Sequence, residues 1–257
     1  MRYEMLGSLQ VRVDGQRRSI SARKTEVLLA ALLIREGQVV SNDQIGNEIW
    51  GDEPPRRAVA ALHVHISQLR KILGSHGRTA GPIETRSPGY LLRLGPEDTV
   101  DVGEFQQLVD RGRAALDHRR YEEASRLLGL ALELWRGPAL AHYQGGLIVS
   151  EFCTWAEEAR LEALELKADA DLALGRHREM VAPLRSLVTE HPLRETFHRQ
   201  LMLALYRAHR QGDALKVYRY ATEMLDCELG VGPGRALREM YQAILASDAA
   251  LELRVAA

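Results

Sequence analysis

The chain has 257 residues, 46% hydrophobic and 27% charged, a composition typical of globular proteins and a length that suits one large domain or two ordinary ones. No stretch approaches the roughly 18 consecutive apolar residues of a membrane span, and the first residues lack a signal-peptide pattern. The two cysteines, Cys153 and Cys227, show no CxxC spacing, so we expect a reduced, cytoplasmic protein without a zinc site.

Charge is distributed unevenly along the chain, although the formal net charge is only −1. Residues 1–94 contain 14 Lys and Arg against 9 Asp and Glu, whereas residues 95–257 contain 20 against 26. Such asymmetry is typical of a basic domain that binds nucleic acid joined to an acidic domain that faces a protein partner, with chance surface variation as the alternative. Because the composition also changes at the Gly-Pro-Glu-Asp stretch that begins at Gly95, we predict two domains, residues 1–95 and 96–257.

The first domain is predicted to mix strands and helices. Short strands are expected over residues 1–20, where Asp14-Gly15 is a strong hairpin turn signal. Ser41 is expected to cap a helix, because Gln44 follows at the spacing of a capping box. The remaining predicted elements, in chain order, are a helix at 23–35, a helix from about 56 to 73, a glycine-rich loop at 74–81, and a hairpin formed by 83–86 and 90–94.

The second domain is predicted to be entirely helical. Gly and Pro residues separate its helical segments, and similar helix-turn elements recur 35 residues apart at Arg178 and Asp213. That period is typical of stacked helix pairs of the tetratricopeptide kind. The expected helices are 101–118, 121–135, 148–174, 177–190, 194–209, 212–228 and 234–247.

The segment from Pro54 to Ile83 is basic and contains no Asp or Glu. A helix with this composition can face a polyanion without repulsion from its own carboxylates. The hairpin that follows contributes one more arginine, Arg86, so the sequence predicts a protein that binds DNA. The basic and histidine residues of the segment are Arg56, Arg57, His63, His65, Arg70, Lys71, His76 and Arg78.

The helix of this segment has two chemically different faces when successive residues are placed 100° apart. One side is predicted to be a buried apolar stripe. The other is expected to be exposed, with Arg70 on a flank. The predicted stripe is Ala58, Val59, Leu62, Ile66, Leu69 and Leu73, and the predicted exposed side is Arg56, Arg57, Ala60, His63, Val64, Ser67, Gln68 and Lys71.

The exposed side suits the major groove of DNA. Gln68 can pair with an adenine edge, Ser67 can bond to several bases, and Val64 with Ala60 can contact a thymine methyl group. The predicted phosphate contacts are Arg56, Arg57, Arg70 and Lys71, and Arg86 is expected to enter the adjacent minor groove. The alternative for each residue is an ordinary solvated helix face.

Enzymatic chemistry is the weakest hypothesis. No GxSxG, HExxH or strand-linked GxGxxG motif occurs, so no catalytic residue and no cofactor is predicted. His63 and His65 point about 200° apart on a helix and cannot share a metal ion from one face. The acidic run from Glu157 to Glu165 is expected to be a solvated face, with contact to a polymerase as the alternative. The aromatic residues expected to pack between helices are Trp135, Trp155, Tyr206 and Tyr218.

Three motifs together resemble a known family. The stretches VVSNDQIGNEIWGDEPP, HVHISQLRKIL and IETRSPGYLL, in this order and spacing, resemble the winged helix-turn-helix domain of OmpR-type response regulators. The whole chain is similar to the Streptomyces antibiotic regulatory protein family, through Asp101, Phe105 and the YEEA and LELWRG stretches of its second half.

The resemblance implies an α+β winged helix-turn-helix domain followed by an all-α, tetratricopeptide-like bacterial transcriptional activation domain. It implies a cytoplasmic, nucleoid-associated activator of a secondary-metabolite gene cluster. Such proteins bind tandem direct repeats in double-stranded promoter DNA near the −35 element, as two copies head to tail. They recruit RNA polymerase holoenzyme through its sigma factor.

The resemblance also assigns site residues. It places His65, Ser67, Gln68, Arg70 and Lys71 in the family's base- and phosphate-contacting positions. It matches Trp50 to a phosphate-contacting tryptophan and places Thr85 and Arg86 in the wing. OmpR relatives often carry arginine where this chain has Ser67 and Gln68, and the wing is about one residue shorter, so the target sequence cannot be transferred. No receiver domain and no GxxxxGK[ST] loop is recognised.

Two other functions remain open at this point. The chain could be a repressor or architectural DNA-binding protein whose helical half only dimerises. It could also be an adaptor whose helical repeats bind a peptide or small effector.

Overall fold

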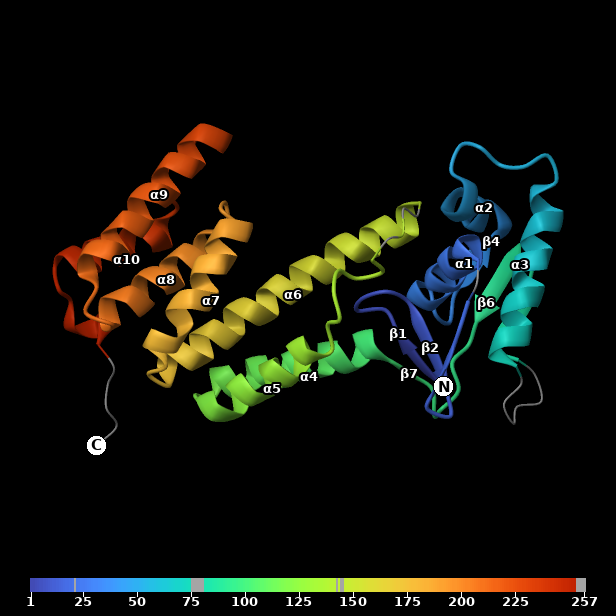
Figure 1. Ribbon diagram of the computed structural model, residues 1–257, viewed down its shortest axis with the longest axis horizontal. Helices are drawn as coiled ribbons and strands as arrows, with labels where there is room; N and C mark the ends of the chain where they lie inside the picture. Colours follow the sequence, from blue (N-terminus) through green and yellow to red (C-terminus); the bar gives the residue numbers. More distant parts are fainter. Residues whose placement is uncertain (21, 75–80, 142, 144–145, 253–257) are drawn as a thin grey trace. The chain divides into compact units, whose positions relative to one another are not determined.

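The computed structural model describes residues 1–20, 22–74, 81–141, 143 and 146–252 (Figure 1). The predicted basic-segment residues His76 and Arg78, and most of the predicted glycine-rich loop, lie outside the described residues. The chain forms two compact units: unit 1 comprises Met1–Leu108 with Ala131–Leu161, and unit 2 comprises Val109–Leu130 with Glu162–Ala257. These units do not divide the chain at residue 95, where the sequence predicted the domain boundary. That boundary stays a prediction about separately folding domains.

A four-stranded sheet begins unit 1. Asp14 and Gly15 have positive φ angles, 50° and 77°, which is the conformation that a tight two-residue hairpin requires. The two-residue strand β7 was not predicted, and it pairs in parallel with β1 directly before the helical part begins. The strands, in the sheet order β3-β2-β1-β7, are β3 (Gln16–Arg18), β2 (Gln10–Val13), β1 (Arg2–Glu4) and β7 (Thr99–Val100).

The predicted winged helix follows and is confirmed. The capping box at Ser41 is present in both directions, since the Ser41 side chain accepts from the Gln44 amide and the Gln44 side chain accepts from the Ser41 amide. A second sheet has the order β4-β6-β5. The elements are α1 (Arg23–Ile34), β4 (Val39–Ser41), α2 (Asn42–Trp50), α3 (Ala58–Leu73), β5 (Ile83–Arg86) and β6 (Gly89–Leu92).

Two details of α3 correct the sequence prediction. The helix begins at Ala58, so Arg56 and Arg57 lie in the turn before it and not on its first turn. Val59, which was predicted to be buried, is 56% exposed. The buried stripe therefore consists of Leu62, Ile66, Leu69 and Leu73, which pack against the almost wholly buried helix α1.

A glycine fixes the approach of β6 to β4 at the base of the wing. A Cβ atom on Gly89 would lie 1.9 Å from the carbonyl oxygen of Val40, which is far inside van der Waals contact. Only glycine fits here without displacing the backbone, so the sequence GY at the start of β6 is required by the packing of this sheet.

Two buried carboxylates join the strands and the winged helix to later parts of unit 1. Glu48 of α2, 4% exposed, accepts hydrogen bonds from the amides of Ile148 (2.7 Å) and Val149 (3.3 Å) at the start of α6 (Leu147–Ala173). Asp101, 1% exposed, accepts from the amides of Met5 and Leu6 at 2.8–3.0 Å. Such bonds satisfy backbone donors that have no partner within their own segment.

Asp101 also lies 3.4 Å from a guanidinium nitrogen of Arg136, the arginine of the LELWRG stretch. Burial raises the pKa of Asp101, and the two amides with Arg136 act against that shift. Trp135 of the same stretch packs edge-on against Phe105, with ring centroids 5.4 Å apart. Asp101, Phe105 and the LELWRG stretch therefore meet in unit 1, whereas the YEEA stretch lies in unit 2.

The remaining helices agree with the sequence prediction to within about two residues at each end. In unit 2, α7 packs on α8 and α8 on α9, as expected for tetratricopeptide-like helix pairs (Figure 1). They are α4 (Asp101–Asp117), α5 (Tyr121–Glu133), α7 (His177–Glu190), α8 (Glu195–Arg207), α9 (Gln211–Leu229) and α10 (Arg235–Leu245), followed by a 3-10 turn at Ala249–Leu251.

A polar cluster fixes the start of α5 against the end of α6 in unit 2. Asp171, 2% exposed, accepts from the Ser125 hydroxyl (2.7 Å), from Lys167 (2.6 Å) and from Arg176 (2.8 Å). Burial acts to raise the pKa of Asp171, but the bonds from these donors outweigh it and hold the pKa below its ordinary value. The carboxylate is therefore charged and fully paired, as a buried charge must be.

Replacing Leu69 by alanine is expected to destabilise the winged helix. The side chain is fully buried against α1, so we expect a loss of about 2–5 kcal/mol in the free energy of unfolding. Denaturant unfolding followed by circular dichroism measures it. The matched control is Val59→Ala on the exposed first turn of the same helix, expected to change stability by less than about 0.5 kcal/mol. Equal effects of the two substitutions would contradict the orientation of α3.

Candidate nucleic-acid interface

One face of α3 is the buried apolar stripe. We call the opposite, exposed face the outer face of α3. In Figure 1, α3 lies at the edge of the winged helix, beyond α1 and β6. Val64, on this outer face, is 56% exposed, as is Val59 on the first turn of the same helix. The predicted contact residues that the structure places together on this exposed face are His63, Val64, Ser67, Gln68 and Lys71, with Ala60 among them.

Two of these residues contact a buried threonine of α1. The Thr25 hydroxyl donates to Oε1 of Gln68 at 3.1 Å and lies 2.9 Å from Nδ1 of His65. Thr25 is 1% exposed. Gln68 and His65 therefore have defined orientations and are not freely rotating side chains of a solvated face. The sequence analysis missed Thr25, because a threonine in a helix with no repeated motif gives no signal of its own.

His65 lies at the junction of α1, α2 and α3. Its ring centroid is 6.5 Å from that of Trp50, and the Lys24 ammonium is 5.9 Å from the Trp50 ring. Burial, followed by the positive charge of Lys24, lowers the pKa of His65 and so favours the neutral imidazole. Trp50, predicted to contact phosphate, is thus grouped with an exposed lysine that the sequence analysis did not single out.

Arg70 and Thr85, both predicted as DNA contacts, are bonded to each other. Arg70 donates to the Thr85 hydroxyl at 2.8 Å and to the carbonyl oxygen of Ile83 at 3.1–3.2 Å, and its guanidinium lies 6.0 Å from the Tyr90 ring. These bonds attach strand β5 of the wing to α3. The arginine consequently has a structural function, and its contact with phosphate stays a prediction.

The wing arginine has an acidic neighbour. Arg86 pairs with Glu84 at 2.8 Å while its own side chain remains 60% exposed. The hydrogen bond from Arg86 lowers the pKa of Glu84, and Arg93 acts in the same direction. Because this pair is exposed to solvent, it is weak and its arginine can exchange Glu84 for a phosphate.

The last predicted contacts are plain surface cations. Arg56 and Arg57 are exposed in the turn before α3, and Lys71 is exposed near its end. Lys71 has no ion pair with any of the described residues, unlike Arg86. It is therefore the residue on which a phosphate contact can be tested with least disturbance of the protein.

A metal site and a membrane-spanning helix are two alternatives to a DNA-binding surface. Within 1–20, 22–74, 81–141, 143 and 146–252, no three His, Cys, Asp or Glu side chains are grouped so that they could bind a metal ion. In that same part of the chain, no helix is both long and apolar enough to cross a membrane.

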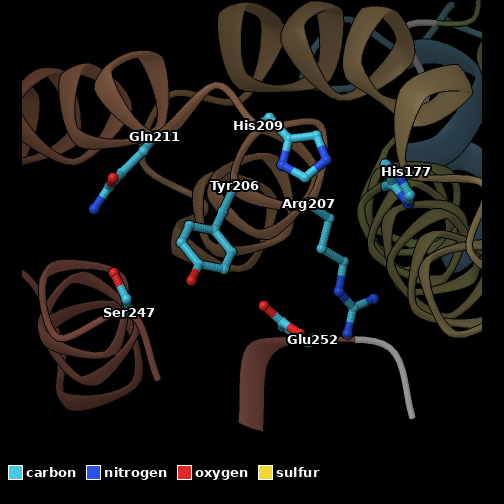
Figure 2. A pocket seen from close by; sticks show the side chains of 7 residues that line it. All are labelled: His177, Tyr206, Arg207, His209, Gln211, Ser247 and Glu252. Atoms are coloured by element: carbon cyan, nitrogen blue, oxygen red, sulfur yellow. The ribbon is translucent and has the colours of Figure 1, made fainter. Parts of the chain in front are cut away.

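Unit 2 contains a polar pocket of about 450 Å³ (Figure 2). Its central cation, Arg207, donates to the carbonyl oxygens of Leu172 (2.8 Å) and Leu251 (2.7 Å). Burial lowers the pKa of this arginine. The guanidinium thus joins the end of α6 and the carboxyl-terminal turn to α8, which accounts for its burial without a ligand. The residues lining the pocket are His177, Tyr206, Arg207, His209, Gln211, Ser247 and Glu252.

Comparison with known proteins assigns the family. The family described as "Transcriptional regulatory protein, C terminal" matches residues 15–92, and the "Bacterial transcriptional activator domain" family matches residues 100–245. The transcriptional regulator RedD of Streptomyces coelicolor is 39% identical over 97% of this chain and 71% of its own length. The regulatory protein DnrI of Streptomyces peucetius is 33% identical over 98% of this chain and 94% of its own length.

The chain belongs to the Streptomyces antibiotic regulatory protein family. It is accordingly a transcriptional regulator of the OmpR-type winged-helix class, related to the regulators RedD and DnrI. A solved structure, Mycobacterium tuberculosis EmbR in complex with a low affinity phosphopeptide, matches with a TM-score of 0.89 and 35% identity. That match covers 96% of this chain and 65% of the EmbR chain. The chain spans only a quarter of the length of another relative, the regulatory protein AfsR of Streptomyces coelicolor, at 38% identity.

Substitutions at two neighbouring positions of α3 should show that Arg70 contributes to stability and that Lys71 does not. Arg70→Ala removes the bonds to Ile83 and Thr85, and we expect a loss of about 0.5–1.5 kcal/mol in the free energy of unfolding. Lys71→Ala removes no bond to a described residue and should leave the free energy of unfolding within about 0.5 kcal/mol of the parent. Thermal unfolding of both variants measures the difference, and an unchanged melting temperature for Arg70→Ala would contradict the attachment of the wing.

Proposed function

We propose that this chain is a sequence-specific DNA-binding transcriptional activator that inserts α3 into the major groove. The observation that carries the proposal is the chemistry of the outer face of α3. The whole segment 54–83 contains no Asp or Glu. The opposite face of the helix is a fully buried apolar stripe. An α-helix fits the major groove of B-DNA, and base edges there distinguish all four base pairs. Val64, 56% exposed on this face, can contact a thymine methyl group in the major groove.

The contacts divide by chemistry. Val64, Ser67 and Gln68 are proposed to contact base edges, with His63 and His65 beside them. The cations at the rim are proposed to contact phosphates, which position the protein but carry no sequence information. The proposed phosphate contacts are Arg56, Arg57, Arg70 and Lys71 on or before α3, Trp50 after α2, and Thr85 with Arg86 in the wing.

The finer function follows from the relatives and is also a proposal. Two copies are proposed to bind head to tail on tandem direct repeats near the −35 element of a promoter, since a single winged helix covers only a short site. The acidic helical part is proposed to recruit RNA polymerase holoenzyme through its sigma factor and so to activate a secondary-metabolite gene cluster. RedD and DnrI, regulators from Streptomyces, support this reading.

The acidic run of α6 has a weaker claim to a polymerase contact than its sequence suggested. Glu162 pairs with Arg113 at 2.7 Å, and Glu165 pairs with Arg194. Both carboxylates therefore have cationic partners within unit 2. We therefore assign no polymerase contact to them.

Transcription in vitro from the native promoter tests the activator directly. With purified polymerase holoenzyme, the proposal predicts more run-off transcript when the protein is added and a footprint over upstream direct repeats. Less transcript with an intact footprint would instead identify a repressor. The absence of any protected site would favour the effector-binding adaptor.

Lys71→Ala should weaken binding to every DNA sequence by a similar factor. Each phosphate contact contributes about one unit to the slope of log K against log salt concentration, and the variant is expected to lose about one unit. Fluorescence anisotropy at several salt concentrations measures the slope. The matched control is Lys216→Ala in unit 2, which should leave it unchanged. A loss of affinity confined to one base position would contradict the phosphate assignment.

Gln68→Ala should relax the sequence preference at one or two base pairs and cost about 1–3 kcal/mol of binding free energy on the preferred site. Selection from a random-site library reports the preference position by position. An enriched motif identical to that of the parent protein would show that Gln68 does not contact a base.

A further inference from the structure

The orientation of the Gln68 amide is set by a residue outside α3. Thr25 lies in the first turn of α1 and is 1% exposed, so it is shielded from any DNA that approaches the outer face of α3. Its hydroxyl oxygen has two close neighbours, Oε1 of Gln68 at 3.1 Å and Nδ1 of His65 at 2.9 Å.

With the amide oxygen of Gln68 beside the Thr25 hydroxyl, hydrogen counting gives the direction of both bonds. A hydroxyl group has one hydrogen, and the amide oxygen of Gln68 has none, so Thr25 must donate to Gln68. The Thr25 oxygen then accepts, and Nδ1 of His65 must carry the hydrogen that it donates. The Thr25 hydroxyl thus donates one hydrogen bond and accepts another, and His65 lies one helical turn from Gln68 on α3, where it holds this arrangement.

This arrangement leaves Gln68 able to donate but poorly able to accept. The oxygen arm of the amide is turned to α1, and the nitrogen arm, with two N–H groups, makes no hydrogen bond to a described residue. A free glutamine recognises adenine by accepting from N6 and donating to N7, which needs both arms on the base edge. On its major-groove edge, guanine presents two neighbouring acceptors, N7 and O6, and no donor.

We propose that Thr25 determines the base preference of Gln68, so that α3 selects guanine over adenine at the base pair that Gln68 faces. The inference rests on the proposed DNA-binding function and deepens it. It also replaces the adenine contact that the sequence alone predicted for Gln68. Thr25 is a positioning residue, because it acts through Gln68 and does not itself contact a base.

Random-site selection with the parent chain and four variants tests the proposal. Gln68→Ala identifies the position at which Gln68 acts, as the position where preference is lost. At that position the parent should prefer guanine to adenine by about 5-fold or more, the lower end for one good base contact. Thr25→Val keeps the shape of the side chain but removes the hydroxyl, so the amide can turn and the preference should shift towards adenine at this position only. Thr25→Ser keeps the hydroxyl and should retain guanine.

The outcomes separate the two proposals. If no variant and not even the parent enriches a motif, the DNA-binding function itself fails. If the parent enriches a motif but prefers adenine where Gln68 acts, the inference about Thr25 is overturned, whether or not Thr25→Val folds. It is also overturned if a folded Thr25→Val, checked by its melting temperature, keeps the parental preference. A double variant Thr25→Val with Gln68→Ala should match Gln68→Ala alone, because Thr25 has no effect once the amide is gone.

Discussion

The buried stripe of α3 is the constraint on which the proposed interface depends. Leu62, Ile66 and Leu69 are each at most 2% exposed, and their packing on α1 leaves the helix one possible rotation about its axis. A turn of the helix by one residue would bury Ser67 or Gln68 and expose a leucine, at a cost of several kcal/mol by the usual scale of about 1.5–3 kcal/mol for each large apolar side chain. Core packing thus determines that the acid-free face of α3 is the exposed one, and the same packing places Gln68 beside Thr25.

Two buried carboxylates connect the winged helix and the first strands with later segments of unit 1. Glu48 lies on α2, the helix that precedes the proposed recognition helix, and its bonds to the first amides of α6 connect that helix with a 27-residue helix of the second half. Asp101 connects strand residues Met5 and Leu6 with Arg136 in the same way. Removing either carboxylate would leave unpaired amides in the interior, which is more costly than losing a surface bond. The proposed recognition helix α3 and the first part of α6 therefore belong to one packed unit.

The sequence predicted most of the fold because its signals were local. The capping box at Ser41, the Asp14-Gly15 turn and the helix breakpoints each depend on residues within a few positions of one another, and all are present. The two-residue strand β7 and the burial of Glu48 depend on partners about a hundred residues away, and no local pattern indicates them. The same reason explains Thr25 and the bonds of Arg70 to the wing. The exposed residues of the proposed interface could be named from helical periodicity, whereas their orientations required the neighbouring helix.

The central claim is that the outer face of α3 contacts base pairs, and a structure of the chain bound to a duplex from its own footprint tests it most directly. The account predicts that Val64, Ser67 and Gln68 lie within contact distance of base edges in the major groove, with Lys71 beside a phosphate. A complex in which this face is turned to solvent, while DNA contacts another surface of the protein, would contradict it.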